Sequence, residues 1–197
     1  MAVQLQPVNP PMGPNLGFCV GKTTVLTMKE KVWSLSGDTF TITDENDQVV
    51  VQCNGTTFSM SDRKEFLSPD GRPLFSLRNK LLSIHKSFYA EGAGGEIVFE
   101  VKSKFSFLKS KMHATFTNAS DKQVVELECR GDWLDRSATI TDLKNGQVVA
   151  QISRSRFNMR EILGGQQSYY VAVAPNVDLS LMAAICICLD EKENEKK

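Results

Sequence analysis

A lysine-rich segment with two phenylalanines contains the residues of this sequence best suited to binding chemistry. It reads KSKFSFLKSK, and strand alternation places Lys102 with Lys104, and Lys109 with Lys111, on shared faces of a hairpin. Such lysines attract anionic lipid headgroups, each contributing about 1 kcal/mol near a membrane surface. The alternative is a solvated strand face, because lysine also protects sheet edges from pairing with other chains.

A second basic string, at Arg154 and Arg156, allows the same two interpretations. The chain carries 23 basic and 23 acidic residues, so no global field draws it to nucleic acid or to an anionic membrane. We therefore expect no nucleic-acid partner. The candidate contacts for an anionic ligand are Lys102, Lys104, Lys109, Lys111, Arg154 and Arg156.

Catalytic and metal-binding patterns are not recognisable in the sequence. His85 and His113 fall at outward strand positions, without a cysteine or carboxylate at metal-ligand spacing beside them. Cys186 and Cys188 belong to an expected helix, where residues two apart point about 200° apart and cannot share one ion. The run Gly92–Gly95 lacks the lysine and hydroxyl residue of a phosphate loop, and no serine elbow is found. We expect no metal, no cofactor and no enzymatic activity.

Paired acids and glycosylation sequons also occur, and each has an ordinary explanation. Asp44 and Glu45 fall in a turn, where carboxylates bond to nearby backbone N–H groups. A carboxylate pair for acid–base catalysis is the less favoured alternative. The sequons begin at Asn54 and Asn118; they would matter only in a secreted protein, and such triplets arise often by chance.

Cysteine usage favours a reducing compartment. The five cysteines are an odd number, widely scattered, and lack the dense spacing of a disulfide-stapled secreted domain. The Pro-rich opening has no apolar stretch of signal-peptide length. We therefore expect a cytoplasmic protein, peripheral to membranes at most.

Alternating strands must position these side chains. Phe99 and Val101 alternate with Glu100 and Lys102, and about twelve such runs occupy residues 23–174, which predicts half-buried strands. So many antiparallel strands would close on themselves or pack in two layers to remove exposed edges. The turn signals between them are residues 45–47, Asn54-Gly55, Asp70-Gly71, Gly92–Gly95 and Asn145-Gly146.

A weak internal repeat accompanies the strands. The string TITD followed by QVVVQ, at 41–52, returns as TITD followed by QVVAQ at 139–151, and Trp33 and Trp133 precede the two units. Duplication of a hairpin and convergence of similar hairpins explain it equally well. The tryptophans fit caps of a barrel core better than the lining of a ligand pocket.

The C-terminal segment predicts a buried helix. Asp178 suits an N-cap, and Leu179–Leu189 is apolar on every side apart from Ser180. Eleven residues rise about 16 Å, too short for a hydrocarbon core of roughly 30 Å, so we expect no transmembrane segment. The expected organisation is an arm and linker at 1–18, one domain at 19–190 and a charged, frayed tail at 191–197.

These features resemble the LURP-one-related family, whose tubby C-terminal-like fold is also attributed to phospholipid scramblases. The resemblance rests on four strings in order: FTITD at 40–44, LRNKLLSIH at 77–85, GDWLDRS at 131–137 and PNVD at 175–178. It implies a mainly β fold, a closed antiparallel barrel of about twelve strands around the buried helix. It implies no agreed reaction. We expect an intracellular binding or regulatory module with a protein partner; the alternative is a scramblase-like protein that binds phospholipid or phosphoinositide at a membrane surface.

Overall fold

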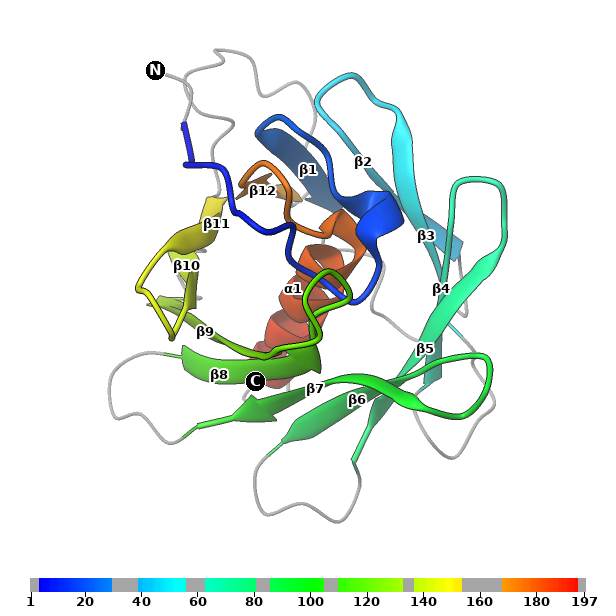
Figure 1. Ribbon diagram of the computed structural model, residues 1–197. Helices are drawn as coiled ribbons and strands as arrows, with labels where there is room; N and C mark the ends of the chain where they lie inside the picture. Colours follow the sequence, from blue (N-terminus) through cyan, green and yellow to red (C-terminus); the bar gives the residue numbers. More distant parts are fainter. Residues whose placement is uncertain are drawn as a thin grey trace.

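The computed structural model describes residues 4–29, 39–55, 63–80, 86–104, 110–132, 137–153 and 168–194. These residues form one short 3-10 helix, η1 (Leu16–Phe18), twelve strands and one α-helix, α1 (Leu179–Asn194) (Figure 1). The strands are β1 Thr24–Lys29, β2 Thr39–Thr43, β3 Val49–Gly55, β4 Arg63–Leu67, β5 Pro73–Asn79, β6 Ser87–Glu91, β7 Ile97–Ser103, β8 Ser110–Thr117, β9 Val124–Asp132, β10 Ser137–Asp142, β11 Val148–Ser153 and β12 Ser168–Val173.

The twelve strands close into one antiparallel barrel in which each strand pairs with its neighbours in sequence. The two ends of the sheet meet where β1 pairs with β12 over six residues, from Thr24 opposite Val173 to Lys29 opposite Ser168. The β1–β2 pairing is narrower, and within the described residues it consists of Thr27 opposite Thr43. The expected mainly β, closed architecture is therefore confirmed. Closure of the sheet leaves few strand edges unpaired.

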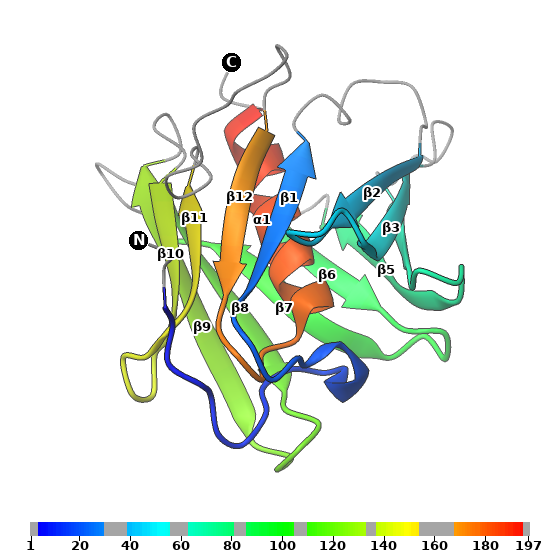
Figure 2. The same cartoon turned by 90° about the horizontal axis from the view of Figure 1, so that it is seen from above.

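Helix α1 runs through the barrel (Figures 1 and 2), and every residue from Leu179 to Asp190 is buried. A helix that is apolar all round must be surrounded on all sides, and a ring of inward-facing strand residues meets that need. Asp178 caps it as expected, since its Oδ1 accepts hydrogen bonds from the backbone N–H groups of Ser180 at 2.9 Å and Leu181 at 3.2 Å. Among the described residues no helix combines the length and hydropathy needed to cross a bilayer.

Inward-facing aromatic residues pack around the helix. Phe66 stacks on Phe75 with ring centroids 4.6 Å apart, and Phe75 meets the edge of Phe99 at 5.1 Å. Such pairs add to the stabilisation from burial. Alternation predicted the buried Phe99 and Val101. Ile97, two residues before Phe99 in the same alternation, is 61% exposed because it begins β7 at the rim of the barrel.

The helix continues beyond the expected end of the domain. It reaches Asn194, four residues into the segment expected to be a frayed tail. Glu191 forms an ion pair with Lys64 of β4, and Lys192 Nζ donates to the carbonyl of Lys111 at 3.1 Å. The charged residues continue the helix because partners on the barrel wall satisfy them, so the expectation of a tail starting at 191 is corrected.

The N-terminal arm is part of the core, which corrects its interpretation as a linker. Its Leu5, Val8 and Met12 are buried in the same cluster as the barrel interior. The arm crosses the end of the barrel where α1 begins, and Val8 and Met12 donate backbone hydrogen bonds to the carbonyls of Pro175 at 3.0 Å and Asn176 at 2.8 Å. Without the arm the start of the helix would face solvent.

Five hairpin turns lie at the same end of the barrel as the arm (Figure 2). Because the strands are antiparallel neighbours in sequence, the connections that follow β2, β4, β6, β8 and β10 all lie at this end. We call the arm, residues 4–22, and these turns the base; the turns lie at 44–48, 68–72, 92–96, 118–123 and 143–147. The turn signals at 45–47, 70–71, 92–95 and 145–146 are confirmed. Asn54-Gly55 is not a turn, since both residues belong to β3 and pair with Glu65 and Lys64.

The internal repeat has a structural counterpart that does not decide its origin. The register shifts between Ile42 and Thr43 in the β2–β3 hairpin and between Ile140 and Thr141 in the β10–β11 hairpin. The β4–β5 and β6–β7 hairpins, which lack the repeated string, contain the same kind of shift. A bulge therefore follows from how these hairpins are built. Trp33 and Trp133 lie outside the described residues.

Candidate functional site

The inside of the barrel offers no reactive thiol. Cys53, Cys129, Cys186 and Cys188 are buried and free. Burial raises the pKa of Cys129 to about 12 and the pKa values of Cys186 and Cys188 well above the ordinary thiol value, because an apolar site disfavours the thiolate. These cysteines remain protonated at physiological pH and serve as small core residues.

A groove at the base is a concave surface on the outside of the barrel. It has a volume of about 640 Å³ and lies between the arm, the β2–β3 turn and the β4–β5 turn. We call it the basal groove. Its apolar walls come from Phe18 and Val20 of the arm, Val49 and Val50 of β3, Leu74 of β5 and Leu179 of α1.

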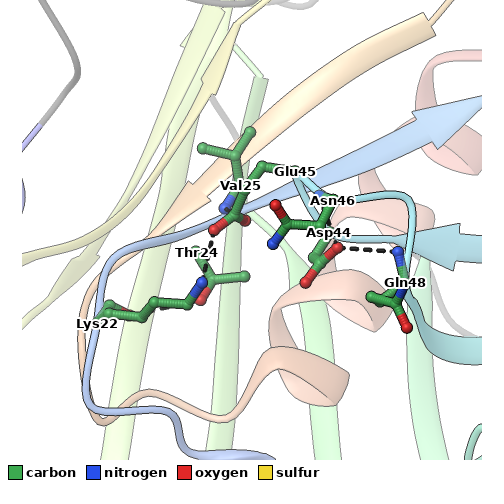
Figure 3. A network of polar contacts seen from close by, with 7 residues as sticks. All are labelled: Lys22, Thr24, Val25, Asp44, Glu45, Asn46 and Gln48. Atoms are coloured by element: carbon green, nitrogen blue, oxygen red, sulfur yellow. Dashed lines mark hydrogen bonds and ion pairs between the residues drawn. The ribbon is translucent and has the colours of Figure 1, made fainter.

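The β2–β3 side of the groove is fixed by a network of polar contacts (Figure 3). Glu45 binds Lys22 Nζ at 2.8 Å through Oε1 and accepts the backbone N–H of Val25 at 3.1 Å through Oε2. If the β1–β2 register continued, Glu45 would stand opposite Val25; its carboxylate replaces the strand carbonyl there. Asp44 Oδ1 accepts from Asn46 N at 2.8 Å and Gln48 N at 2.9 Å, which closes the turn.

The same contacts keep Glu45 and Asp44 ionised. Burial raises the pKa of Glu45, but the hydrogen bonds from Lys22 and Val25 outweigh burial and place the pKa below its usual value. Burial also raises the pKa of Asp44, but the hydrogen bonds from the backbone N–H groups of Asn46 and Gln48 outweigh burial. The pKa of Asp44 is therefore below its usual value as well. The groove therefore has a charged, anionic edge at physiological pH.

The β4–β5 side is built in a similar way. Ser68 Oγ donates to Asp70 and accepts the backbone N–H of Arg72 at 3.0 Å, and Arg72 Nε binds Asp70 Oδ2 at 2.8 Å. The hydrogen bond from Ser68, followed by the one from Arg72, lowers the pKa of Asp70. Two turns locked by their own side chains give the groove a preformed shape, which reduces the entropy lost on binding.

Exposed aliphatic side chains concentrate around the base. The large apolar side chains most exposed among the described residues all belong to the arm or to the beginning or end of a hairpin turn, and they are Leu16, Val20, Val49, Ile97, Val124 and Leu143. Two of them, Val20 and Val49, line the basal groove and are each 36% exposed. Aliphatic groups surrounded by polar ones are typical of an interaction surface.

Comparison with known proteins decides the family. The model of the LURP-one-related family matches residues 24–190, which is most of the chain. This chain belongs to the LURP-one-related family. The protein named LURP-one-related 15 of Arabidopsis thaliana is 25% identical to it, and the match covers 91% of this chain and 85% of that protein. The uncharacterized protein YxjI of Bacillus subtilis is 28% identical, with 84% and 91% covered.

A solved structure supports the fold of this LURP-one-related protein. An X-ray structure of a protein from Arabidopsis thaliana superposes with a TM-score of 0.67 and covers 93% of this chain and 99% of its own. Sequence identity between the two is 20%, so the likeness concerns the fold alone. The resemblance expected from the four strings is confirmed at the level of the family.

The lysine segment of this family member lies on the outer barrel wall beside acidic side chains. Lys102 binds Glu100 at 2.6 Å, and Lys111 binds Glu128 at 2.5 Å. Lys104 is exposed and donates its backbone N–H to Lys111 at 2.9 Å, as expected for a hairpin. Of the other candidate contacts, Lys109, Arg154 and Arg156 lie outside the described residues.

His113 has carboxylate neighbours that the sequence did not predict. Its Nδ1 lies 2.6 Å from Glu126 Oε1 and its Nε2 lies 3.2 Å from Glu128 Oε2. The sequence showed no carboxylate at metal-ligand spacing, and the β8–β9 register brings in these two, which are distant in sequence. Within the described part of the chain no group of three metal-ligating side chains could hold an ion. His85 lies outside that part.

The sequon at Asn118 is occupied by structural contacts. Asn118 is 3% exposed; its Oδ1 accepts the backbone N–H of Gly13 at 3.0 Å, and its Nδ2 donates to Ser120 Oγ at 2.8 Å. The residue ties the β8–β9 turn to the arm, so a glycan could not be attached without breaking this junction.

The sequence interpretation missed the basal groove. It identified the turns one by one, but not that two of them and the arm meet at the same place. Two signals were present: three acids within residues 44–48, and Val49 as an aliphatic residue directly after a turn. Neither signal identifies a groove without the closure of the barrel.

Proposed function

We propose that this LURP-one-related protein is a non-enzymatic binding module that engages a protein partner through the base of its barrel. The observation that carries the proposal is the basal groove, a preformed hollow with apolar walls and charged turns on two sides. This combination of an apolar centre and a polar rim is how protein interfaces are commonly built. The barrel acts as a rigid scaffold that positions the binding turns.

The polar groups near the groove support binding rather than catalysis. The carboxylates Glu45 and Asp70 are engaged by Lys22 and Arg72, and their pKa values are lowered, whereas a general acid or base works best with a pKa near the working pH. The four buried thiols are not nucleophiles for the reasons given above. We therefore include the absence of an enzymatic activity in the proposal.

A cytoplasmic setting is also part of the proposal. All five cysteines are free, and Cys186 and Cys188 are embedded in the central helix without a disulfide partner. Free thiols in such numbers suit a reducing compartment.

The lipid-binding alternative receives less support. The ammonium groups of Lys102 and Lys111 are 2.6 Å and 2.5 Å from carboxylates, so an anionic headgroup would have to compete with Glu100 and Glu128. Sedimentation with anionic liposomes tests this alternative. Binding at low salt that is lost when Lys102, Lys104, Lys109 and Lys111 are changed to Ala would favour it over the protein-binding module.

Affinity capture tests the proposed function. Tagged wild-type protein and the Val20→Lys and Val124→Lys variants would be used as bait in extract of the native cell, followed by quantitative mass spectrometry. We expect a set of proteins captured by the wild type and depleted with Val20→Lys, because a charge at the groove wall disrupts an apolar contact. Substrate turnover by the purified protein, lost on mutation of one polar residue, would instead establish an enzyme.

A further inference from the structure

We propose that the basal groove binds an extended peptide segment of the partner in which basic and aliphatic residues alternate. This inference rests on the proposed function and names the chemistry of the segment that the groove accepts. Its basis is the charge of the base, the unpaired carboxylates at the groove edge, and the two exposed valines on the groove wall.

The base is acidic although the chain as a whole is neutral. The arm and the five turns contain six acidic side chains, Asp44, Glu45, Asp47, Asp70, Glu96 and Asp121, and four basic ones, Lys22, Arg72, Lys122 and Lys144. Six negative and four positive charges leave the base with a net charge of −2, while the complete chain has a net charge of 0. A negative field at one end attracts a basic partner and repels anionic lipid or nucleic acid.

The excess of negative charge lies in the two turns beside the groove. The groove lining itself contains two acids, Asp44 and Asp70, and two bases, Lys22 and Arg72, and the β2–β3 turn adds Glu45 and Asp47. The β2–β3 turn carries three acids in five residues, Asp44, Glu45 and Asp47. Glu45 is paired with Lys22, but among the described residues neither Asp44 nor Asp47 takes part in an ion pair. Asp44 faces the groove with its carboxylate held by backbone N–H groups, and Asp47 is exposed at the tip of the turn. Both can accept a charge-assisted hydrogen bond from a lysine or arginine of the partner.

The apolar wall requires aliphatic residues between the basic ones. Val20 of the arm and Val49 of β3 both line the groove, and each is 36% exposed. In an extended peptide, alternate side chains point to opposite faces, so one face can pack against valines while the other approaches the turn acids. A hollow of about 640 Å³ accommodates a few side chains and not a folded domain.

Three short fluorescein-labelled peptides test the inference by fluorescence anisotropy: one alternates lysine with valine, one serine with valine, and one glutamate with valine. We expect the lysine–valine peptide to bind at least about tenfold more tightly than the serine–valine peptide at low salt. Its affinity should fall as salt is raised from about 0.05 M to 0.5 M, because partly exposed charges are screened.

Matched variants locate the binding. Asp47→Asn removes one charge at a position with a φ of 59°, a conformation that Asn tolerates, and should weaken the lysine–valine peptide about twofold to fivefold. Val49→Ser should weaken it about threefold to tenfold. The controls are Glu96→Gln and Ile97→Ser, an exposed acid and an exposed aliphatic residue at the β6–β7 hairpin, outside the groove. We expect both controls to bind like the wild type.

Several outcomes would overturn the inference. Equal affinity for the three peptides, or preference for the glutamate–valine peptide, would do so. So would equal effects of Asp47→Asn and Glu96→Gln on the affinity for the lysine–valine peptide. Binding of phosphatidylserine vesicles that becomes stronger with Asp47→Asn would also do so. If Val49→Ser does not fold, as judged by circular dichroism, Asp47→Asn and the salt dependence still decide. Partner capture that depends on Val20, combined with failure of the lysine–valine peptide, would refute this inference and leave the proposed function standing.

Discussion

Asp178 provides a quantitative test of how the helix is held in the barrel. Its carboxylate is fully buried at the start of α1, where it accepts hydrogen bonds from Ser180, Leu181 and, at 2.9 Å, the backbone N–H of Asn15 in the arm. Burial raises its pKa from 3.8 to about 6, because desolvation of the charge outweighs the hydrogen bonds. The folded state therefore binds this proton more tightly than the unfolded state does.

The sign of the pH dependence follows from the raised pKa. The contribution of Asp178 to stability is fully present below the unfolded value of 3.8, is lost as the pH rises to about 6, and is constant above that. A pKa difference of about two units, at about 1.4 kcal/mol per unit, gives about 3 kcal/mol. Cys19, whose pKa is raised to about 12 by burial and then by the charge of Asp178, does not titrate in this range.

Urea unfolding followed by circular dichroism, at pH values from about 4 to 7, measures the effect in wild type and Asp178→Asn. The other carboxylates titrate in both proteins, so the difference between the two free energies of unfolding isolates Asp178. Between pH 4 and pH 7 we expect the wild type to lose about 2 kcal/mol of stability relative to Asp178→Asn, because part of the full effect lies below pH 4. A difference that stays constant, or that shifts in favour of the wild type, would refute the reasoning. If the variant does not fold, an NMR-measured pKa of Asp178 below 4 would do the same.

Three further predictions concern packing at the base and in the core. Gly13→Ala should destabilise the protein by more than about 2 kcal/mol, because an added Cβ would lie 2.2 Å from Cβ of Asp178 and the φ of residue 13 is 149°. The control Gly21→Ala, at a position with open space around it, should change the melting temperature little. Phe99→Ala should cost about 3–5 kcal/mol in urea unfolding, whereas Ile97→Ala, at an exposed site, should cost less than about 0.5 kcal/mol. Asn118→Ala should cost about 1–3 kcal/mol and accelerate limited proteolysis of the arm; unchanged proteolysis would show that this residue does not hold the arm in place.

The local elements could be predicted from the sequence because their signals are local. Alternation identified strands such as β7 and β8, and glycines at positive φ, such as Gly71 and Gly146, marked two of the turns. The apolar run after Asp178 predicted a surrounded helix, since no other environment satisfies it. The Asn54-Gly55 signal failed because pairing with β4 kept both residues in a strand, so a tertiary partner overrode a local preference.

The arrangement at the base was decided by the tertiary structure. Nothing local indicates that the arm lies across the end of the barrel, because its contacts with Pro175 and Asn118 join residues more than 100 positions apart. The same holds for the carboxylates beside His113 and for the groove between two turns. The sequence by itself determined which segments are strands, turns and buried helix, through spacing that is set within a few residues. Closure of the barrel decided which turns are neighbours, because pairing between distant strands is fixed by burial of the whole interior and not by any single segment.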